Sequence, residues 1–374
     1  MKPILFIVSL LLSSYALALP VPSAPDLKAR SYHVIDFHSG KIIASKNADL
    51  KLAPASMTKI MTALIAFREI NQGNLLLDEK VRISEKAWRT PGSRMFIEVN
   101  KFVSIDDLLH GMLVQSGNDA TVALAEHIAG DEATFAQLMN QVAHELNMSN
   151  SHFINSSGLP DKEHYTSARD LAILTRALIA ESPELYKINA IKKFSFNGIT
   201  QQNRNKLLWR DSTVDGVKTG HTEDAGYCLA SSAVRENMRL ISIVMGTDSI
   251  EARNDTNQAL LNYGYRFYKT HLLYKANQSL SSTRVWKGEQ ESLDVGLTED
   301  LYLTTPRNQY KNLKASLQLQ PQLIAPIKLN QTVGSAIIKL NGETLATRPL
   351  VALNTVAEGS LIQIVKDELL LLLE

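Results

Sequence analysis

The sequence lacks several features on which whole classes of protein depend. It has one cysteine, Cys228, among its 374 residues, so an intrachain disulfide cannot form. Cys228 lies in an apolar run from Tyr227 to Ala230, where a small buried hydrophobe is the expected role. The nine histidines are scattered without metal-ligand spacing, and the net charge of +1 gives no argument for a nucleic-acid partner. We therefore expect no metal, no cofactor and no nucleic acid.

The sequence also has no internal repeat and no low-complexity tract. Its length of 374 residues allows two or three domains. A composition of 45% hydrophobic and 21% charged residues is that of an ordinary globular protein.

The N-terminus has the pattern of a secretory signal peptide, residues 1–18. Lys2 precedes an apolar core from Ile4 to Leu12, and Ala16-Leu17-Ala18 is a small-x-small cleavage site. An uncleaved anchor is the alternative, although the apolar run is short for a membrane span. Prolines at 20, 22 and 25 then mark a leader and not a helix or strand. Export without a disulfide indicates a protein of the bacterial envelope, in the periplasm.

The stretch Pro54-Ala55-Ser56-Met57-Thr58-Lys59 opens a helix that is apolar on almost every side. Apolar residues at 57, 60, 61, 64 and 65 recur with helical spacing, and a helix of this kind is buried. Pro54 is tolerated at the start, where no amide donor is needed. Lys59 follows Ser56 by one turn, so their side chains should lie side by side. A hydroxyl at the positive end of a helix, beside an amine, suits a nucleophile and its base.

A lone Ser-x-x-Lys is common by chance, and Ser56 could simply cap the helix. Two later stretches, Ser116-Gly117-Asn118 and Lys218-Thr219-Gly220, change that interpretation. The three motifs in this order are typical of β-lactamases and penicillin-binding proteins. Taken alone, Ser116-Gly117-Asn118 would be no more than a good turn.

The surrounding patterns predict where these motifs lie. Residues 31–45 read as a hairpin with a turn at Ser39-Gly40. A capping-box pattern at Ser104 starts a helix that should end near Val114. Asp119 can cap a second helix that ends near Ile128, which places the second motif on a loop between helices. A further helix is expected from Leu171 to Ile179.

The third motif should lie on or beside a strand of an antiparallel sheet. It follows Val214-Asp215-Gly216-Val217 and precedes two strand candidates, residues 227–234 and 240–245. Arg253 is expected after this sheet, ahead of a helix that covers roughly residues 256–268.

The composition changes after His271 to short, often alternating apolar runs. Asn341-Gly342, between two such runs, is a strong hairpin signal. This region reads as a small all-β domain, residues 273–357. The last segment, residues 358–374, reads as a short amphipathic tail. Its apolar residues lie on one helical face and its charged residues mark another, which suits a helix in a membrane interface. The apolar residues are Leu361, Ile362, Val365, Leu369, Leu372 and Leu373.

On these motifs the chain resembles the low-molecular-mass penicillin-binding proteins, the serine-type D-alanyl-D-alanine carboxypeptidases of peptidase family S11. The resemblance covers the whole mature chain. The further segments that match the family pattern are Gln115-Ser116-Gly117-Asn118-Asp119-Ala120, Asn203-Arg204-Asn205, His221 and Arg169-Asp170.

The resemblance implies a fold and a location. It implies an α/β (α+β) serine β-lactamase/transpeptidase-like domain over residues 25–272, with helices on a five-stranded antiparallel sheet. A β-rich C-terminal domain follows. Family members often end in an amphipathic helix that holds them on the outer face of the inner membrane, so peripheral membrane contact through the tail is expected.

The resemblance also implies an activity. The substrates are peptidoglycan stem peptides ending in D-Ala-D-Ala, so a role in cell wall biogenesis follows, and β-lactam antibiotics acylate the same serine. Ser56 attacks the penultimate carbonyl and forms an acyl-enzyme. Lys59 takes the Ser56 proton, for which it must be neutral, at a cost of about 4.6 kcal/mol at pH 7. Burial and a neighbouring cation, which we expect to be Lys218, favour the neutral form.

The remaining roles follow from the same resemblance. Ser116 relays the proton to the leaving amine, and Asn118 holds Lys59 and a substrate amide. The backbone N–H groups of Ser56 and His221 form the oxyanion hole. His221 and Asp170 assist deacylation by water. The terminal carboxylate is bound by Lys218, Thr219, Gly220, Arg204 and Arg253. For Arg253 a solvated surface charge is the alternative, and for Asp170 it is first-turn helix chemistry.

Three other functions stay open from the sequence. A β-lactamase of the same fold usually has Asp in the middle of the second motif, where this chain has Gly117. A DD-endopeptidase that cuts crosslinks typically lacks the β-rich second domain. A non-catalytic β-lactam-binding scaffold would tend to have lost one of the motif residues, all of which are present.

Overall fold

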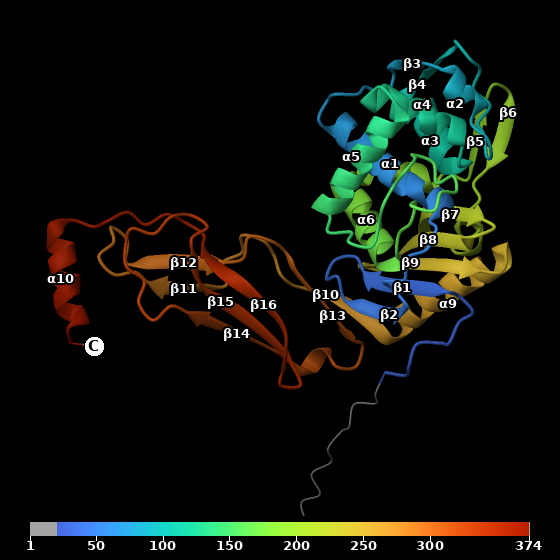
Figure 1. Ribbon diagram of the computed structural model, residues 1–374. Helices are drawn as coiled ribbons and strands as arrows, with labels where there is room; N and C mark the ends of the chain where they lie inside the picture. Colours follow the sequence, from blue (N-terminus) through green and yellow to red (C-terminus); the bar gives the residue numbers. More distant parts are fainter. Residues whose placement is uncertain (1–20, 374) are drawn as a thin grey trace, which may run out of the picture.

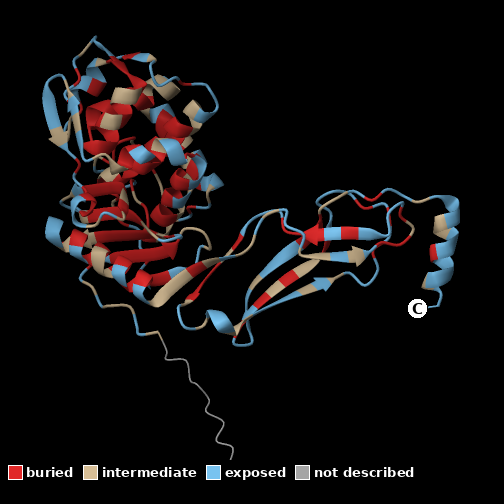
Figure 2. Cartoon of the chain, turned by 180° about the vertical axis from the view of Figure 1, so that it is seen from behind, coloured by how far each residue is buried: buried red, intermediate tan, exposed pale blue. Residues whose placement is uncertain are grey.

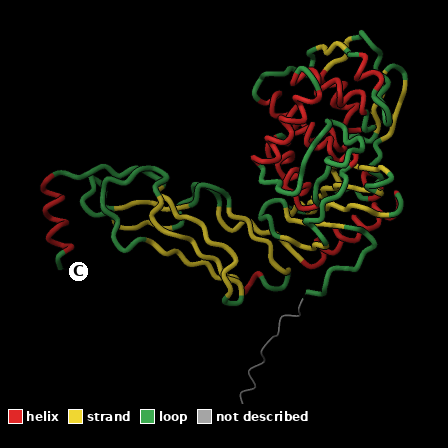
Figure 3. Tube along the Cα trace, viewed as in Figure 1, coloured by secondary structure: helices red, strands yellow, loops and turns green. Residues whose placement is uncertain are grey.

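The computed structural model describes residues 21–373, so the predicted signal peptide at residues 1–18 lies outside the described residues. Figure 1 shows two parts that extend away from each other. The larger part combines helices and a sheet, and the smaller part is built of strands, as the tube in Figure 3 makes plain. A last helix, α10 (Leu361–Leu371), lies at the far end of the smaller part.

A five-stranded antiparallel sheet forms the middle of the larger part, in the order β2-β1-β9-β8-β7. The predicted α/β class and five-stranded sheet are confirmed. The predicted hairpin at residues 31–45 is the β1–β2 pair, and Gly40 has φ of +71° in its turn. The strands are β1 (Ser31–Asp36), β2 (Ile42–Lys46), β7 (Val214–Thr222), β8 (Gly226–Arg235) and β9 (Met238–Thr247).

Helices cover both faces of this sheet, and each face has its own apolar core. On one face α9 (Ile250–Phe267) packs on β8 and β9. On the other face the core is built around α1 (Lys59–Asn71), which is buried from Lys59 to Phe67. Figure 2 shows this concentration of buried residues in the larger part. The prediction of a buried central helix is therefore confirmed.

The other helices complete the layer around α1. They are η1 (Ala55–Thr58), α2 (Glu85–Arg89), α3 (Ile105–Val114), α4 (Asn118–Ala129), α5 (Glu132–Glu145), α6 (Ala168–Glu181), α7 (Pro183–Tyr186) and η2 (Lys187–Ala190). The short α8 (Leu207–Arg210) belongs to the other face, where Leu207 and Leu208 join the core beneath α9. Two small antiparallel strand pairs lie beside these helices, made of β3 (Lys80–Arg82) with β4 (Phe102–Ser104), and β5 (Lys193–Phe196) with β6 (Ile199–Gln202).

Helix α3 ends at Val114 as predicted, and Ser104 caps it by accepting a hydrogen bond from the Asp107 N–H at 3.1 Å. The cap predicted for α4 is wrong, because Gly117 is the N-cap residue. Asp119 lies inside the first turn, and its carboxylate accepts hydrogen bonds from the N–H groups of Met95 and Phe96, at 2.9 Å each. Its carboxylate therefore holds a distant loop, and it also accepts a hydrogen bond from the Ala120 N–H of the first turn at 2.9 Å.

Helix α9 starts earlier than the sequence patterns predicted. Ser249 caps it, with its hydroxyl 3.0 Å from the Ala252 N–H. Arg253, which we expected before the helix, therefore lies in its first turn.

The smaller part has a second five-stranded sheet, in the order β11-β12-β16-β15-β14. The predicted hairpin turn at Asn341-Gly342 is confirmed, since both residues have positive φ and Leu340 pairs with Glu343. A two-stranded ribbon of β10 and β13 links this sheet to α9, so the predicted division at residue 273 falls inside β10. The strands are β10 (Tyr268–Tyr274), β11 (Ser281–Arg284), β12 (Ser292–Gly296), β13 (Leu301–Pro306), β14 (Leu313–Leu319), β15 (Thr332–Leu340) and β16 (Glu343–Ala352). Between β13 and β14 lies η3 (Tyr310–Asn312).

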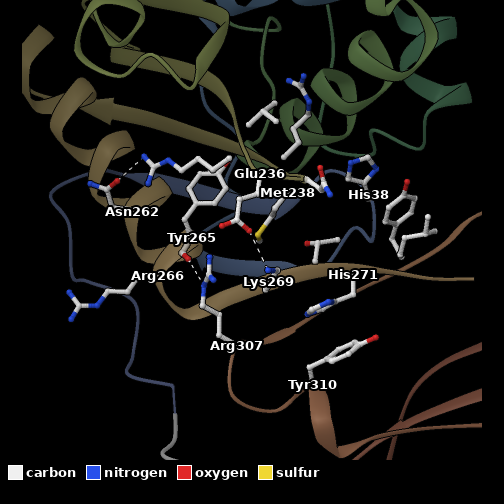
Figure 4. Close-up of a pocket in the computed structure, with 17 residues that line it drawn as sticks. His38, Glu236, Met238, Asn262, Tyr265, Arg266, Lys269, His271, Arg307 and Tyr310 are labelled. Atoms are coloured by element: carbon white, nitrogen blue, oxygen red, sulfur yellow. Dashed lines mark hydrogen bonds and ion pairs between the residues drawn. The ribbon is translucent and has the colours of Figure 1, made fainter.

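A buried polar network holds the ribbon against the larger part. Asp36 is fully buried, and its carboxylate accepts hydrogen bonds from Ser39 Oγ at 2.8 Å and Thr270 Oγ1 at 2.6 Å. Thr304 contacts both hydroxyls. Beside this network a cavity of about 1120 Å³ lies between the two parts. Figure 4 shows Lys269 and Arg307 in it, from the ribbon side, with Glu236 from the β8–β9 turn. The junction therefore packs side chains from both parts.

Candidate active site

Ser56 and Lys59 lie together at the start of the buried helix, as their spacing predicts. Ser56 is on the 3-10 turn η1, and Lys59 is the first residue of α1. Lys59 Nζ lies 3.0 Å from Ser56 Oγ, 2.7 Å from Asn118 Oδ1 and 2.7 Å from the Ser157 carbonyl oxygen. Asn118 Nδ2 donates to the Pro91 carbonyl at 2.7 Å, so its amide oxygen must face Lys59.

These contacts define what neutral Lys59 can do. A carbonyl oxygen accepts and cannot donate, so Asn118 and Ser157 take two N–H groups of the amine. A neutral amine has only those two N–H groups. Its lone pair is then directed at the Ser56 hydroxyl, and the geometry suits proton transfer from Ser56 Oγ to Lys59 Nζ.

The environment of Lys59 favours the neutral amine. Complete burial is the main cause, and the Arg204 charge adds to it, so the pKa of Lys59 falls from 10.5 to about 7. The charges of Lys59 and Lys218, the neighbouring cation that we predicted, do interact, and that interaction lowers the pKa of Lys218. Arg204, which lowers the pKa of Lys59, is a further cation that the sequence did not indicate. Burial, with the charges of Lys59, Arg204 and Arg253, in turn holds the pKa of Lys218 well below its usual value.

The second and third motifs meet at one hydrogen bond. Lys218, on β7, donates from Nζ to Ser116 Oγ at 2.9 Å and to the Thr219 carbonyl at 3.1 Å. Ser116 lies between α3 and α4 with φ of +71°, as the prediction of a loop between helices requires. This left-handed conformation is uncommon for a residue with a side chain and brings the Ser116 hydroxyl to Lys218.

Gly117 is required by close packing. A Cβ at this position would lie 2.8 Å from Asp119 Oδ1 and 3.0 Å from the Met95 nitrogen. The aspartate that many β-lactamases have here therefore does not fit this loop without a shift of backbone.

Ser56 and Ser116 open into a cleft of about 420 Å³, while Lys59 and Lys218 are buried behind it. His221 lines the cleft from β7, with its ring against that of Tyr227 at a centroid distance of 4.0 Å. The lining residues are Ser56, Ser93, Ser116, Gln202, Asn203, Arg204, Lys206, Thr219, Gly220, His221, Tyr227, Ile250 and Arg253.

Two guanidinium groups in this cleft have no acidic partner among residues 21–373. Arg253 is only 4% exposed, which contradicts a solvated surface charge. It donates weakly to the Gly220 and Arg204 carbonyl oxygens, at 3.4 and 3.5 Å, and its Nε has no partner among the described residues. Burial lowers the pKa of both Arg204 and Arg253. Arg253 is buried without a counterion, whereas Arg204 is exposed at the mouth of the cleft. Cations without an acidic partner are ready to receive an anionic group.

Asp170 lies elsewhere, in the first turn of α6. Its buried carboxylate accepts hydrogen bonds from the Asn150 N–H at 2.8 Å and from Ser151 Oγ at 2.7 Å. These contacts hold the start of the loop between α5 and α6. Its suggested role in deacylation stays a prediction.

Sequence reasoning missed several residues of the cleft. Tyr227 pairs with His221 across the β7–β8 hairpin, so the hairpin register could have revealed it. Ser93 and the Ser157 carbonyl come from loops distant in sequence, and no local pattern indicates them.

Comparison with known proteins supports the same assignment. Residues 20–249 match the family model of D-alanyl-D-alanine carboxypeptidase, and residues 268–358 match that of penicillin-binding protein 5, C-terminal domain. The chain is 41% identical to D-alanyl-D-alanine carboxypeptidase DacA of Escherichia coli K12, over 91% of this chain and 86% of that protein. It is 42% identical to DacC of the same strain, over 90% and 86%.

Solved structures agree with both parts of the fold. Penicillin-binding protein 5 from Haemophilus influenzae superposes with a TM-score of 0.86 at 39% identity, covering 90% of this chain and all of that one. Penicillin-binding protein D2 from Listeria monocytogenes, solved with ampicillin bound, has a TM-score of 0.60 at 31% identity and covers 64% of this chain and all of that one.

Proposed function

Because this chain belongs to the D-alanyl-D-alanine carboxypeptidases of peptidase family S11, we propose how its own residues carry out that reaction. Ser56 Oγ attacks the carbonyl of the penultimate D-alanine while its proton passes to Lys59 Nζ. The C–N bond then breaks, terminal D-alanine leaves as an amine, and an ester to Ser56 remains. Water hydrolyses this ester and restores the Ser56 hydroxyl.

The single observation that carries this proposal is the geometry of Lys59. Two carbonyl oxygens occupy two of its N–H groups, at 2.7 Å each, and Ser56 Oγ lies at the third position. Lys59 is thus oriented to take the serine proton as soon as it is neutral.

Ser116 and Lys218 are the proposed route for the proton that the leaving amine needs. Lys218 Nζ donates to Ser116 Oγ at 2.9 Å, which leaves the Ser116 hydroxyl hydrogen free to face the substrate. Ser116 can therefore pass a proton to the departing nitrogen and regain one from Lys59 or Lys218.

The substrate carboxylate is assigned to the end of the cleft lined by Thr219, Arg204 and Arg253. Charge-assisted hydrogen bonds of this kind contribute about 1.5–3 kcal/mol each. They favour a free C-terminus over a chain that continues, which supports carboxypeptidase action on stem peptides over cutting of internal crosslinks. The match of residues 268–358 to the C-terminal domain of penicillin-binding protein 5 also favours carboxypeptidase action, because the DD-endopeptidases typically lack this domain.

β-Lactams are proposed to acylate Ser56 as well. The Listeria protein D2 was solved with ampicillin bound, and 64% of this chain superposes on the whole of that protein. Labelling by penicillin therefore gives a direct assay of the acylation step.

Substituting the proposed nucleophile tests these assignments. In Ser56→Ala we expect the release of D-alanine from diacetyl-Lys-D-Ala-D-Ala and the covalent labelling by fluorescent penicillin both to be lost. Ser316→Ala, an exposed serine on β14, is the control and should behave as the parent protein. Labelling that persists in Ser56→Ala would show that another residue is the nucleophile.

We also propose that the mature protein is periplasmic and lies on the outer face of the inner membrane, held there by α10. Within residues 21–373 no helix is both long and apolar enough to cross a membrane. Helix α10 supports a peripheral contact, because its apolar face is turned to solvent: Leu361 is 81% and Ile362 83% exposed. One of its two acidic residues, Asp367, is turned inward and is only 1% exposed, while Glu368 stays exposed beside Lys287.

A further inference from the structure

The loop that follows α5 wraps around the turn that carries Ser56. Gly158 packs directly on Ala55, so that a Cβ at position 158 would lie 1.9 Å from the Ala55 carbonyl oxygen and 2.8 Å from Thr58 Oγ1. The neighbouring Ser157 supplies the carbonyl that holds Lys59. This loop therefore touches both the peptide before the nucleophile and the base.

A buried chain of hydrogen bonds runs from the same loop to Ala55. His164 Nδ1 accepts from the Ile154 N–H at 3.1 Å, so the neutral ring must carry its proton on Nε2. Nε2 then donates to Thr58 Oγ1 at 2.8 Å, and Thr58 Oγ1 donates to the Ala55 carbonyl at 2.8 Å. Burial lowers the pKa of His164 to about 4, in keeping with a neutral ring. Each donor in this series of hydrogen bonds meets one acceptor, so the direction of every hydrogen bond in it is fixed.

These hydrogen bonds end on the peptide unit that contains the Ser56 N–H. In a planar trans peptide the C=O and the N–H point in opposite directions, so fixing the Ala55 carbonyl fixes the Ser56 amide. Ala55 lines a separate cavity with Gly158 and His164, whereas Ser56 lines the catalytic cleft. Ala55 also has φ of +48°, a left-handed conformation that is unfavourable for a non-glycine residue. A peptide in that conformation keeps its orientation only if its surroundings hold it.

We propose that His164 and Thr58 are positioning residues for the acylation step, and that they hold the Ala55–Ser56 peptide so that the Ser56 N–H faces the cleft. This rests on the proposed function, in which that N–H stabilises the oxyanion. The Thr58 hydroxyl transmits the position of the His164 ring to the nucleophile's amide. Thr58 is thereby the functional residue inside Ser56-Met57-Thr58-Lys59 that the motif itself leaves unassigned.

A purely structural role for Thr58 predicts lost stability and unchanged chemistry, so the test separates the two. Thr58→Val removes the hydroxyl and keeps the shape of the side chain. Thr62→Val is the matched control: Thr62 is also buried on α1, and its hydroxyl donates to the Ser156 carbonyl at 2.7 Å. Thr58→Val loses the buried hydrogen bonds to Ala55 and His164, and Thr62→Val loses the one to Ser156, but only Thr58 contacts the Ala55 peptide. Thr58→Ser restores the hydroxyl.

Two measurements use benzylpenicillin: the rate constant of acylation and the affinity of the non-covalent complex. The third is the infrared carbonyl stretch of the acyl-enzyme, for which the benzylpenicillin is ¹³C-labelled at the lactam carbonyl. All are made below the lowest melting temperature of the set. Removal of one hydrogen-bond donor from an oxyanion hole typically lowers kcat by about 100- to 1,000-fold. For a donor that is misaligned but present we expect a loss of about 10- to 100-fold in acylation rate in Thr58→Val, with unchanged non-covalent affinity.

The ester carbonyl of the Thr58→Val acyl-enzyme should absorb at higher wavenumber, because a weaker oxyanion contact polarises it less. Thr58→Ser and Thr62→Val should match the parent protein in rate and spectrum. His164→Gln should slow acylation as well, and the double variant with Thr58→Val should be no slower than Thr58→Val, since the two residues act through one chain.

Two results would overturn the proposal. If Thr58→Val folds and matches Thr62→Val in acylation rate and carbonyl stretch, the relay has no role in catalysis, although the proposed function stands. If the parent protein is acylated on a peptide that does not contain Ser56, the proposed function and the relay both fail. Should Thr58→Val not fold, His164→Gln alone decides, by the same rate and spectrum.

Discussion

At the scale of single residues, Lys59 determines how the enzyme responds to pH. Its pKa is lowered to about 7, by burial first and by the Arg204 charge second. Only the neutral amine accepts the Ser56 proton, so the acylation rate should fall as the pH drops below about 7 and rise to a plateau above it. Arg204→Gln removes a cation that disfavours charged Lys59. The pKa of Lys59 should then rise, and the acid limb of the profile should move to higher pH.

The measurement is the pH dependence of penicillin acylation between about pH 5 and 9. Lys206→Gln is the matched control, because Lys206 is a second cation that lines the cleft but does not shift the pKa of Lys59. It should leave the midpoint in place. An unmoved midpoint in Arg204→Gln, or equal shifts in both variants, would mean that Arg204 does not tune the base.

Arg253 should act on the substrate carboxylate more than on stability. In Arg253→Ala we expect kcat/KM for diacetyl-Lys-D-Ala-D-Ala to fall by about 10- to 100-fold, since one charge-assisted contact of about 1.5–3 kcal/mol is lost. The C-terminally amidated tripeptide offers no carboxylate, and its already low kcat/KM should change little. Arg266→Ala, an exposed arginine on the same helix, should leave both substrates unaffected. Equal losses on acid and amide would show that Arg253 does not bind the carboxylate.

The residues that sequence reasoning identified best are those whose partners are close in the chain or belong to a known motif set. The contact of Ser56 with Lys59 follows from one turn of helix. The Lys218–Ser116 contact spans 102 positions, and only the motif set indicated it. Arg204 as the cation beside Lys59, and the Ser157 carbonyl as its acceptor, depend on how loops fold over α1, which no local pattern records.

At the scale of helices and strands, the predictions succeeded where a turn or cap signal was short-range. The β1–β2 hairpin, the loop at the second motif and the turn at Asn341-Gly342 are all of this kind. The misplaced start of α9 had a local signal too, since Ser249 is a good cap and was passed over. Asp119 was misassigned for another reason: its partners, Met95 and Phe96, lie in a loop distant in sequence.

The helix predicted to begin at Ser56 starts in fact as a 3-10 turn, with the α-helix beginning at Lys59. The positive φ of Ala55 and the contact with Gly158 set this turn. Propensity could not foresee it, because tertiary contacts impose the conformation. The strained turn is also the part of the fold on which the proposed oxyanion donor depends.

At the scale of the whole molecule, the two parts and α10 form one extended body (Figure 1). The buried contacts of Asp36 with Ser39 and Thr270 tie the ribbon to the catalytic part. At the other end, Asp367 of α10 accepts a hydrogen bond from the Lys287 N–H at 2.6 Å and lies near Arg284. Polar contacts thus hold both ends of the smaller part, and a membrane bound at α10 would be kept away from the cleft by the length of that part.

The orientation of α10 removes the main argument against membrane contact. The tail carries more acid than base, and each charge that faces an anionic surface matters by about 1 kcal/mol. The alternative to membrane contact is that α10 packs on the β domain as an ordinary terminal helix. It does pack there, but through its polar side: Asp367 meets Lys287, and Glu368 pairs with the Lys287 side chain. The apolar side stays free, and each leucine that it buries in lipid contributes about 1.5–3 kcal/mol.

We therefore expect the protein to bind vesicles of phosphatidylethanolamine and phosphatidylglycerol through α10, with detergent releasing it and high salt leaving it bound. A chain that ends at Glu358 should stay in the supernatant after sedimentation, and Leu369→Asp with Leu372→Asp should do the same, because both leucines are exposed on the apolar face. Leu345→Asp, at an exposed leucine on β16, is the matched control and should sediment with the vesicles. If the full chain and the chain ending at Glu358 are equally soluble, both with vesicles and in the periplasmic fraction of cells, α10 is no anchor. Its exposed leucines would then need another partner, since an apolar face of this size seldom stays in water.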